Sequence, residues 1–369
     1  MGEIELECVH LGLVPSRVNP MLSTLLSTTP ERLAEWMAER GFPRFHARQV
    51  FRWVFDRRAE DFGQMSDLPK ALRGALAEEW KVFGSKIAHH SVAPDGTDKL
   101  LLECADGKRV ECVLMAVEDR RTVCISTQVG CGMGCVFCAS GLKGVERNLS
   151  KAEILEQVIR ARNLLPIEER LTNLVVMGMG ESLANLDNLI AALDWICSKD
   201  GLGFGQRRVT ISTVGLPEKM RKLAGLDRQY HLAVSLHAAR EEVRNELVPI
   251  NERVGLSAVM DAADAYFQKT GRQVTFEYVM LRGINDGPED SQALGRLLAK
   301  RKAHANLIPY NPVAGLPYER PSPEAIRDFV ETVERYGVSV TVRKTKGREI
   351  DAACGQLRRR VEAIAPAGS

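Results

Sequence analysis

Residues 130–138 of the sequence read Gly130-Cys131-Gly132-Met133-Gly134-Cys135-Val136-Phe137-Cys138. This stretch sets three cysteines at C-x3-C-x2-C spacing on a loop rich in glycine. Thiolates are preferred ligands of iron–sulfur clusters, and glycines let a short loop wrap around a compact cluster. Three thiolates on a four-iron cluster leave one iron without a protein ligand, and an open metal position allows chemistry. The stretch therefore predicts a catalytic [4Fe–4S] cluster held by Cys131, Cys135 and Cys138.

A structural zinc site is the competing interpretation of the same cysteines. Closed zinc sites usually draw their ligands from two CxxC-like pairs, and the sequence offers no second pair of this kind. The chain has nine cysteines, an odd number, and its N-terminus is acidic before it is hydrophobic, unlike a secretory signal. A disulfide framework is therefore not expected. A non-catalytic, zinc-containing RNA-binding protein stays open as the alternative.

The cysteine loop follows the first strand of a regular strand–helix alternation. Strands are expected at Thr122–Thr127, Asn173–Met177, Val209–Thr213, His231–Leu236, Val274–Leu281 and Ala305–Pro309, with a last one at Val338–Val342. Six strand–helix units with right-handed crossovers predict a parallel sheet, too short for an eight-fold barrel. We expect an α/β fold, an open partial (βα)6 barrel whose ligands lie at the carboxyl ends of the strands.

The segment before the barrel has a different pattern. Thr29-Pro30 supplies a capping hydroxyl and a proline at the first helical position, and two further helical patterns follow. A β-hairpin is expected around Asp106-Gly107. The predicted organisation is an N-terminal extension at 1–28, a helical RNA-binding domain with the hairpin at 29–116, the barrel at 117–349, and a C-terminal segment at 350–369.

Polar residues recur just after the predicted barrel strands. Since these strand ends meet at one rim of a parallel sheet, the residues are expected to converge there. Glu181, after the second predicted strand, suits a cationic ammonium group, and Gly180 beside it lets a ligand approach the backbone. In chain order the candidates are Gly180 and Glu181, Ser212, Ser235-Leu236-His237, and Asn311.

Composition indicates an ordinary globular protein with no membrane span. The chain has 369 residues, of which 45% are hydrophobic and 27% charged, and a net charge of +2. A cytoplasmic location is expected. This net charge does not by itself indicate a nucleic-acid partner, so any basic surface that binds one must be local. Two local runs qualify: Arg40, Arg44, Arg48, Arg52, Arg57 and Arg58, and then Arg343, Lys344, Lys346 and Arg348 with Arg358–Arg360.

With its cluster loop after the first barrel strand, the sequence resembles the radical S-adenosylmethionine superfamily. That resemblance implies S-adenosylmethionine as cofactor, bound to the open iron and cleaved by one-electron reduction to a 5′-deoxyadenosyl radical. It implies the rim residues as cofactor contacts. It also implies a low-potential electron donor, such as flavodoxin or ferredoxin.

Further motifs resemble the RlmN/Cfr family of RNA adenosine methyltransferases, and RlmN most. They include Gln49-Val50-Phe51-Arg52-Trp53, Arg147-Asn148-Leu149, Asn306-Leu307-Ile308-Pro309-Tyr310-Asn311-Pro312 and Ala353-Cys354-Gly355-Gln356-Leu357. The resemblance places the family's two further catalytic cysteines at Cys124 and Cys354 and its proton acceptor at Glu111. Ser182 departs from the family pattern, which continues its glycine-rich motif with proline.

The resemblance also implies a reaction. Cys354 accepts a methyl group, the radical removes one hydrogen from it, and the resulting methylene radical adds to an adenine. Cys124 then attacks the Cys354 sulfur and releases the base. Lys346 and Arg348 are candidates for lowering the thiol pKa. The implied product is 2-methyladenosine in 23S ribosomal RNA and, for many members, in transfer RNA. Cfr-like methylation of carbon 8 stays open as the alternative.

Overall fold

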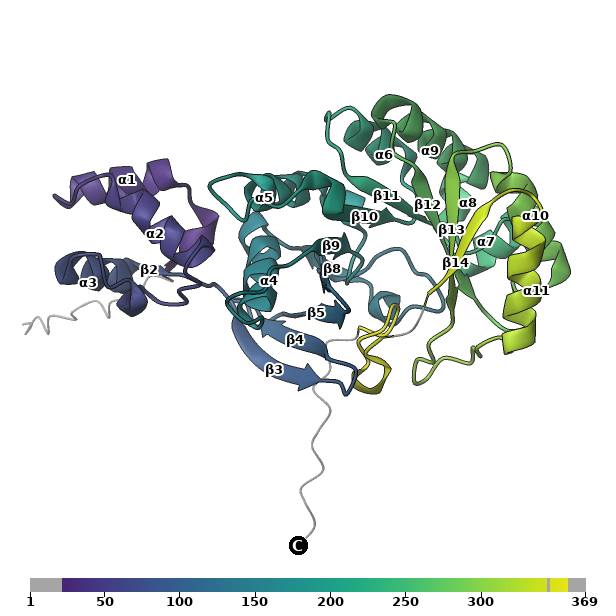
Figure 1. Cartoon of the computed structure of the whole chain (residues 1–369), viewed down its shortest axis with the longest axis horizontal. Helices are drawn as coiled ribbons and strands as arrows, with labels where there is room; N and C mark the ends of the chain where they lie inside the picture. The colour runs from purple at the N-terminus through teal and green to yellow at the C-terminus, as the bar shows by residue number, and fades with distance from the viewer. Residues whose placement is uncertain (1–21, 344–345, 358–369) are drawn as a thin grey trace, which may run out of the picture.

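The computed structural model describes residues 22–343 and 346–357. Its centre is a ten-stranded sheet in the order β14-β13-β12-β11-β10-β9-β6-β5-β4-β3 (Figure 1). From β6 to β14 all neighbouring strands are parallel, as predicted for the open barrel. These strands are β6 (Arg120–Cys124), β9 (Asn173–Val176), β10 (Val209–Thr213), β11 (His231–Ser235), β12 (Val274–Met280), β13 (Ala303–Pro309) and β14 (Ser339–Val342).

Helices connect the parallel strands and pack on the outer face of the sheet (Figure 1). Parallel strands covered in this way read as continuous apolar runs, and in β11 the side chains of Leu232, Ala233 and Val234 are all fully buried. The helices are α4 (Lys151–Asn163), α5 (Leu186–Cys197), α6 (Pro217–Ala224), α7 (Glu241–Leu247), α8 (Asn251–Val254), α9 (Leu256–Thr270), α10 (Pro288–Leu298) and α11 (Pro323–Glu334).

Antiparallel strands extend the barrel sheet on one side. The predicted hairpin consists of β4 (Thr97–Glu103) and β5 (Arg109–Val117), and β5 pairs with β6 so that Val113 lies opposite Cys124. The edge strand β3 (Lys86–Val92) was not predicted. Its sequence is mostly polar and its side chains are exposed or half-buried, so no apolar alternation marks it as a strand.

The helical domain contains α1 (Pro30–Glu39), α2 (His46–Phe55) and α3 (Lys70–Glu79). The Thr29 hydroxyl caps α1 by accepting the Arg32 N–H at 3.4 Å, as its sequence predicts. Short elements complete the described chain: β1 (Ser23–Thr24), β2 (Trp80–Lys81), β7 (Gln128–Gly130), β8 (Val145–Asn148), and the 3-10 helices η1 (Leu25–Ser27), η2 (Phe62–Gln64), η3 (Ala139–Gly141), η4 (Ser182–Asn185), η5 (Gln206–Arg208) and η6 (Arg348–Ile350). Across the described residues, none of the helices has the length and apolar character to cross a bilayer.

The helical domain is fastened to the barrel by aromatic stacking and by two arginines. Phe51 and Phe55 of α2 stack on Trp195 of α5, with ring centroids 5.4 and 5.6 Å apart. Arg162 of α4 is buried and donates to the carbonyls of Val54 and Phe55. Arg58 makes a similar connection, and its guanidinium donates to the backbone carbonyls of Leu165, Pro166, Ile167 and Glu169. The carbonyls at the end of α2, which have no helical partner, are thus satisfied across the junction.

We predict that Arg162→Met lowers the free energy of unfolding by about 2 kcal/mol, because two buried carbonyls lose their donor. Removing the buried charge offsets part of the loss. Urea unfolding of the apoprotein measures the effect. The exposed neighbour Arg170 provides the matched control, Arg170→Met. Equal unfolding midpoints for the two variants would show that Arg162 does not hold the junction.

Candidate active site

The cysteine loop is closed at its base by the short β7–β8 pair. The Cys131 N–H donates to the Gly144 carbonyl at 3.0 Å, and Gly130 lies opposite Val145. A Cβ at Gly130 would approach the Gly144 oxygen to 2.1 Å, and Gly130 has φ of +81°. Only glycine fits there. The backbone that leaves Cys131 thus returns to its starting point at Gly144, so the three cysteines are held on one compact loop.

The three cysteines line one cavity of about 150 Å³ at the carboxyl ends of the strands. Burial raises the pKa of Cys131 to about 11 and raises the pKa of Cys135 and Cys138 as well. Thiolates in this place therefore need a positive partner, which the irons of a cluster supply. Among the described residues, no three His, Cys, Asp or Glu side chains converge on a position suited to a single metal ion.

The glycine-rich loop after β9 forms the next wall of this cavity. Gly180 has φ of +102°, and a Cβ on it would lie 2.6 Å from the Cβ of Gln128. The Glu181 carboxylate is buried and accepts the N–H groups of Leu183 and Val214, both at 2.9 Å. Burial raises the pKa of Glu181 against these hydrogen bonds. Its orientation is fixed, and a cationic group in the cavity would stabilise its charged form.

The remaining predicted rim residues meet at the same cavity with one exception. Ser212, Ser235, His237 and Asn311 all line it, and the hydroxyls of Ser212 and Ser235 are 3.3 Å apart. Leu236 differs, because its side chain is fully buried in the hydrophobic core. Ser182, where the family has proline, donates through its hydroxyl to the carbonyl of Val176 at 3.2 Å.

His237 is held as a neutral imidazole. It has φ of +60°, and its Nδ1 accepts the Val279 N–H at 3.1 Å, so the ring proton belongs on Nε2. Burial, with a contribution from Arg244, lowers the pKa of His237 to about 3. The ring meets Phe137 of the cysteine loop edge-on, with centroids 4.9 Å apart. A neutral N–H donor thus stands at the rim.

Cys124 and Cys354 come together from distant parts of the chain. Both are free thiols, and both line a second cavity of about 110 Å³ next to the first. Burial raises the pKa of Cys124 to about 12, and the nearby Cys354 adds to the shift. Two hydrogen bonds tie the C-terminal segment to η3, directly after the cysteine loop: Ala139 N–H to the Gly355 carbonyl at 2.8 Å, and the Ser140 hydroxyl to the Leu357 carbonyl at 3.1 Å.

Two charged residues of the site were not identified as such from the sequence. Arg343, which the sequence placed in a basic surface run, is half-buried and lines both cavities. The nearby Cys354 raises the pKa of Arg343, and Arg343 in turn opposes the rise in the pKa of Cys124. Glu277 on β12 is buried and accepts from the Asn306 amide at 2.7 Å. Arg343 directly follows β14, whereas Glu277 lies within β12, opposite Ser235 at the end of β11.

Glu111 lies in a separate cavity of about 240 Å³. Its carboxylate is buried and 3.2 Å from the ammonium group of Lys99. Asp351 and Gln356, which flank Cys354 in the sequence, line the same cavity. Glu111 therefore lies on another side of the segment that carries Cys354.

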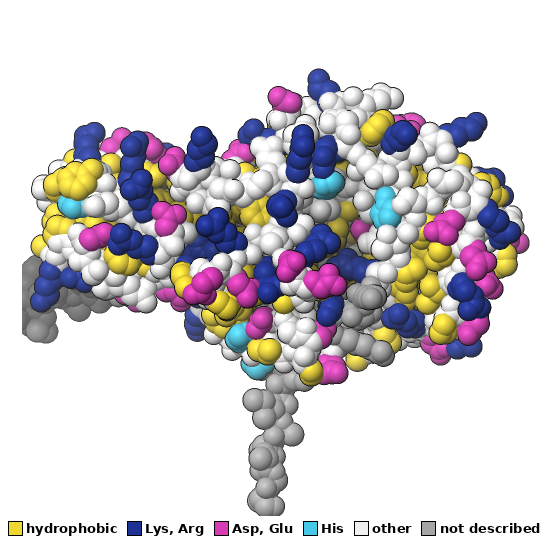
Figure 2. All heavy atoms as spheres, in the orientation of Figure 1, with side chains coloured by type: hydrophobic (Ala, Val, Ile, Leu, Met, Phe, Trp, Pro, Cys, Tyr) yellow, Lys and Arg dark blue, Asp and Glu magenta, His cyan; other side chains and the backbone are white. Residues whose placement is uncertain are grey.

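The first basic run divides into two groups. Arg40, Arg57 and Arg58 have structural partners: Arg40 pairs with Glu79 and Arg57 with Asp67. Arg44, Arg48 and Arg52 are exposed on the helical domain. Figure 2 shows Lys and Arg side chains over this domain and toward the middle of the visible face. In the second run, Lys346 lines the Cys124–Cys354 cavity, and Lys344 and Arg358–Arg360 lie outside the described residues.

We predict that His237 weakens the fold in acid. Its folded-state pKa of about 3 lies below the ordinary 6.5. Between these values the unfolded chain binds a proton that the folded chain does not, so stability falls as the pH decreases below 6.5. From pH 7 to pH 5 the loss is about 2 kcal/mol. His237→Asn keeps an acceptor and tolerates positive φ. Urea unfolding should show a smaller loss for this variant, and equal losses would refute the prediction.

Comparisons with known proteins agree with this geometry. Residues 125–294 match the radical SAM superfamily, and residues 23–82 match the ribosomal RNA large subunit methyltransferase N-terminal domain. The chain is 52% identical over 340 residues to the "Probable dual-specificity RNA methyltransferase RlmN" of Rhodopirellula baltica, covering 92% of each protein. It is 45% identical to the "Dual-specificity RNA methyltransferase RlmN" of Desulfosudis oleivorans, covering 94% of this chain and 93% of that protein.

A crystal structure of a radical SAM methyltransferase from Sphaerobacter thermophilus superposes with a TM-score of 0.88 and 41% identity, covering 92% of this chain and 100% of that one. Radical SAM enzymes use a [4Fe–4S] cluster and S-adenosylmethionine, which are therefore the cofactors of this chain. The alternative of a non-catalytic zinc protein is wrong. Matches at both the helical domain and the barrel, with relatives aligned over nearly the whole length, show that the chain belongs to the RlmN family of radical S-adenosylmethionine RNA methyltransferases.

Proposed function

We propose that this chain methylates carbon 2 of an adenine in 23S ribosomal RNA, and an adenine in transfer RNA, through an S-methylcysteine at Cys354. The observation that carries the proposal is that Cys124 and Cys354 line one cavity beside the cysteine loop. The helical domain's match to a ribosomal RNA large subunit methyltransferase domain supports the ribosomal substrate. The words "dual-specificity" in the names of the relatives support a second RNA.

The chemistry of the target explains why two cysteines are required. Carbon 2 of adenine lies between two ring nitrogens and is electron-poor, so it does not attack a methyl sulfonium. The bound cluster and S-adenosylmethionine supply a radical that abstracts a hydrogen atom. Cys131, Cys135 and Cys138 are the residues proposed to hold the cluster, and Gly180, Glu181, Ser212, Ser235, His237 and Asn311, with the backbone of Leu236, those proposed to hold S-adenosylmethionine.

Cys354 carries the methyl group on its sulfur, and loss of one hydrogen atom from that group lets its carbon bond to the adenine. The adduct then loses the carbon 2 proton to a base, the proposed role of Glu111, and one electron, which the bound cluster would accept, so that the ring becomes aromatic again. Cys124 then attacks the Cys354 sulfur. The sulfur–sulfur bond forms as the sulfur–carbon bond breaks, and the electron pair goes to the departing base, which takes up a proton. The resulting disulfide is reduced by an external thiol before the next turnover. A flavodoxin- or ferredoxin-type protein is the proposed electron donor.

Arg343 is proposed to assist the attack by Cys124. Only the thiolate is a good nucleophile, and burial holds the pKa of Cys124 near 12. Arg343 lines the cavity of both sulfurs and opposes the rise in the pKa of Cys124. Glu111 stays the proposed proton acceptor on the strength of the family resemblance, and its ion pair with Lys99 would have to open for that role.

The two cysteines predict opposite phenotypes. Cys354→Ala should retain iron and sulfide but form no methylated base, because the carbon carrier is gone. Cys124→Ala should form the carbon bond to RNA without releasing it, so a protein–RNA adduct should accumulate on a denaturing gel. Cys197→Ala, at a half-buried cysteine of α5, is the matched control and should act like the parent enzyme.

Mass spectrometry of digested RNA against 2-methyladenosine and 8-methyladenosine standards reads out the product. Methylation by Cys354→Ala would refute the carrier role. 8-Methyladenosine would replace the carbon 2 assignment with Cfr-like chemistry and leave the cysteine roles standing.

The RNA-binding surface is proposed to include the exposed face around α2. Phe45 is 62% exposed, and it shares a cleft of about 250 Å³ with Arg44 and Arg48. An exposed aromatic ring beside two guanidinium groups suits an unpaired base and its phosphates.

Phe45→Ala is expected to weaken RNA binding about tenfold, because it removes the ring on which one base would stack. Arg48→Ala should weaken binding and reduce its salt dependence, because one phosphate contact is lost. Arg57→Ala, at an arginine paired with Asp67 on the same domain, is the control. Filter binding at several salt concentrations gives the comparison. Affinities unchanged in both test variants would place the RNA surface elsewhere.

A further inference from the structure

Gln128 connects the two loops that form the cofactor cavity. It begins β7, three positions before Cys131, and its side chain is 5% exposed. Its Oε1 accepts the Glu181 N–H at 2.8 Å, and its Nε2 donates to the Asn148 Oδ1 at 2.7 Å. Both ends of the amide are thus engaged, one by the glycine-rich loop and the other by the strand that closes the cysteine loop.

The contact between Gln128 and the glycine-rich loop is tight as well as hydrogen-bonded. A Cβ on Gly180 would collide with the Cβ of Gln128 at 2.6 Å, so the absence of a side chain lets the two segments meet. The Gln128 N–H also donates to the Met179 carbonyl at 3.3 Å. The backbone from Met179 to Glu181 therefore rests directly on Gln128.

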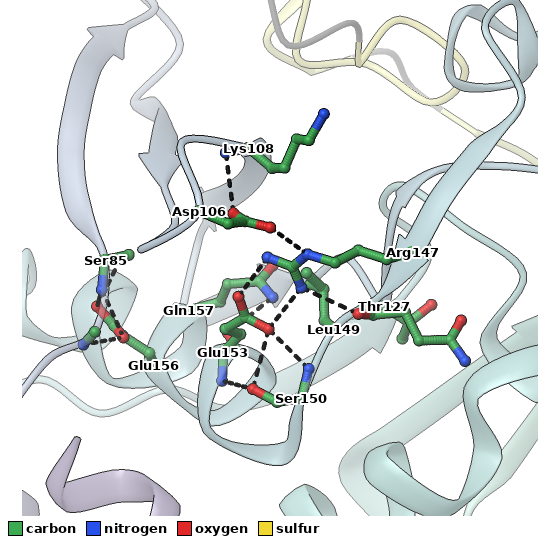
Figure 3. Close-up of polar contacts among 12 residues, drawn as sticks. Ser85, Asp106, Lys108, Thr127, Arg147, Leu149, Ser150, Glu153, Glu156 and Gln157 are labelled. Atoms are coloured by element: carbon green, nitrogen blue, oxygen red, sulfur yellow. Dashed lines mark hydrogen bonds and ion pairs between the residues drawn. The ribbon is translucent and has the colours of Figure 1, made fainter. Parts of the chain in front are cut away.

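Asn148, the other partner of Gln128, is itself held in place. It pairs with Gln128 across β7 and β8. Its neighbour Arg147 lies between two carboxylates, 2.6 Å from Asp106 and 2.8 Å from Glu153 (Figure 3). Glu153 also closes a capping box with Ser150 at the start of α4. The Asn148 end of the Gln128 bridge is thus anchored to the hairpin turn and to a barrel helix.

We propose that Gln128 is a positioning residue for S-adenosylmethionine: it fixes Gly180 and Glu181 relative to the cysteine loop. The inference rests on the proposed assignment of Gly180 and Glu181 as cofactor contacts. S-adenosylmethionine must reach both the open iron and this loop, so its affinity depends on the spacing between the two loops. Gln128 touches neither cysteine nor cofactor in this role and acts through Glu181.

The test is Gln128→Met, which keeps the length of the side chain and removes both hydrogen bonds. S-adenosylmethionine binding to the anaerobically reconstituted enzyme should weaken about tenfold, the scale of one or two lost buried hydrogen bonds. Iron content should stay near that of the parent, while the lost hydrogen bonds should lower the apoprotein melting temperature by only a few degrees. Equilibrium dialysis gives the affinity, and electron paramagnetic resonance of the reduced cluster should need more S-adenosylmethionine to show its ligand-induced change.

Three further variants separate positioning from general stability. Asn148→Asp keeps the acceptor for Nε2 and should bind S-adenosylmethionine like the parent, whereas Asn148→Ala should bind about threefold more weakly. Gln206→Met is the matched control. Gln206 belongs to η5, away from the cavity, and its side-chain oxygen also accepts a backbone N–H, that of Gln229.

Parent-like affinity in both Gln128→Met and Asn148→Ala would overturn the inference, as would weaker binding matched by equal loss of iron and of apoprotein stability. None of these measurements uses RNA. A failure of the proposed base modification therefore leaves the result of this test unaffected.

Discussion

The active site depends on one backbone hydrogen bond, from the Cys131 N–H to the Gly144 carbonyl, which closes the cysteine loop. The bond is possible only because Gly130 has no Cβ to strike that carbonyl. The parts of the chain proposed to bind the cofactors take their positions from this closure. The C-terminal segment attaches to η3 at the end of the loop, and the glycine-rich loop rests on Gln128 at its start. A shift at the base of the loop would move all three parts together.

The burial of charge sets the chemistry of the cavities. Thiols, an imidazole and two carboxylates all lie where solvent is scarce. Burial raises the pKa of the thiols and carboxylates and lowers the pKa of the imidazole, so it favours the neutral form of each group. Irons and a sulfonium would stabilise the thiolate and carboxylate forms of these groups. Arg343 supplies positive charge beside the two cysteines of the second cavity, which Lys346 also lines.

Much of the architecture could be predicted from the sequence, because strong local signals agree with it. Val209–Thr213 is a strand with the predicted bounds, and Thr29 caps its helix as expected. The predicted strand Thr122–Thr127 ends early, at Cys124, because the chain then leaves β6 to enter the cysteine loop. The candidate rim residues converge, since a parallel sheet brings strand ends together whatever their separation in sequence.

What could not be predicted depends on contacts rather than on patterns. Gln128 has no local signature, because its role is defined by Glu181 and Asn148, which are remote in the sequence. Arg343 looks like a member of a solvated basic run until the sheet places it in the cavity that Cys124 and Cys354 line. Glu111 matches its family position, yet its cavity and its Lys99 partner follow from the pairing of β4 with β5.

The junction between the helical domain and the barrel has a consequence for substrate choice. The guanidinium groups of Arg58 and Arg162 donate to backbone carbonyls across the junction, and Trp195 adds a stacked aromatic face, so the two parts share one interior. Because the junction fixes the distance between the proposed RNA surface of the helical domain and the cavities of the barrel, recognition would depend on the shape of the RNA rather than on its nucleotide sequence. Under the proposed function, two different RNA molecules would be equivalent substrates whenever each presents an unpaired adenine at that distance from a backbone of matching curvature.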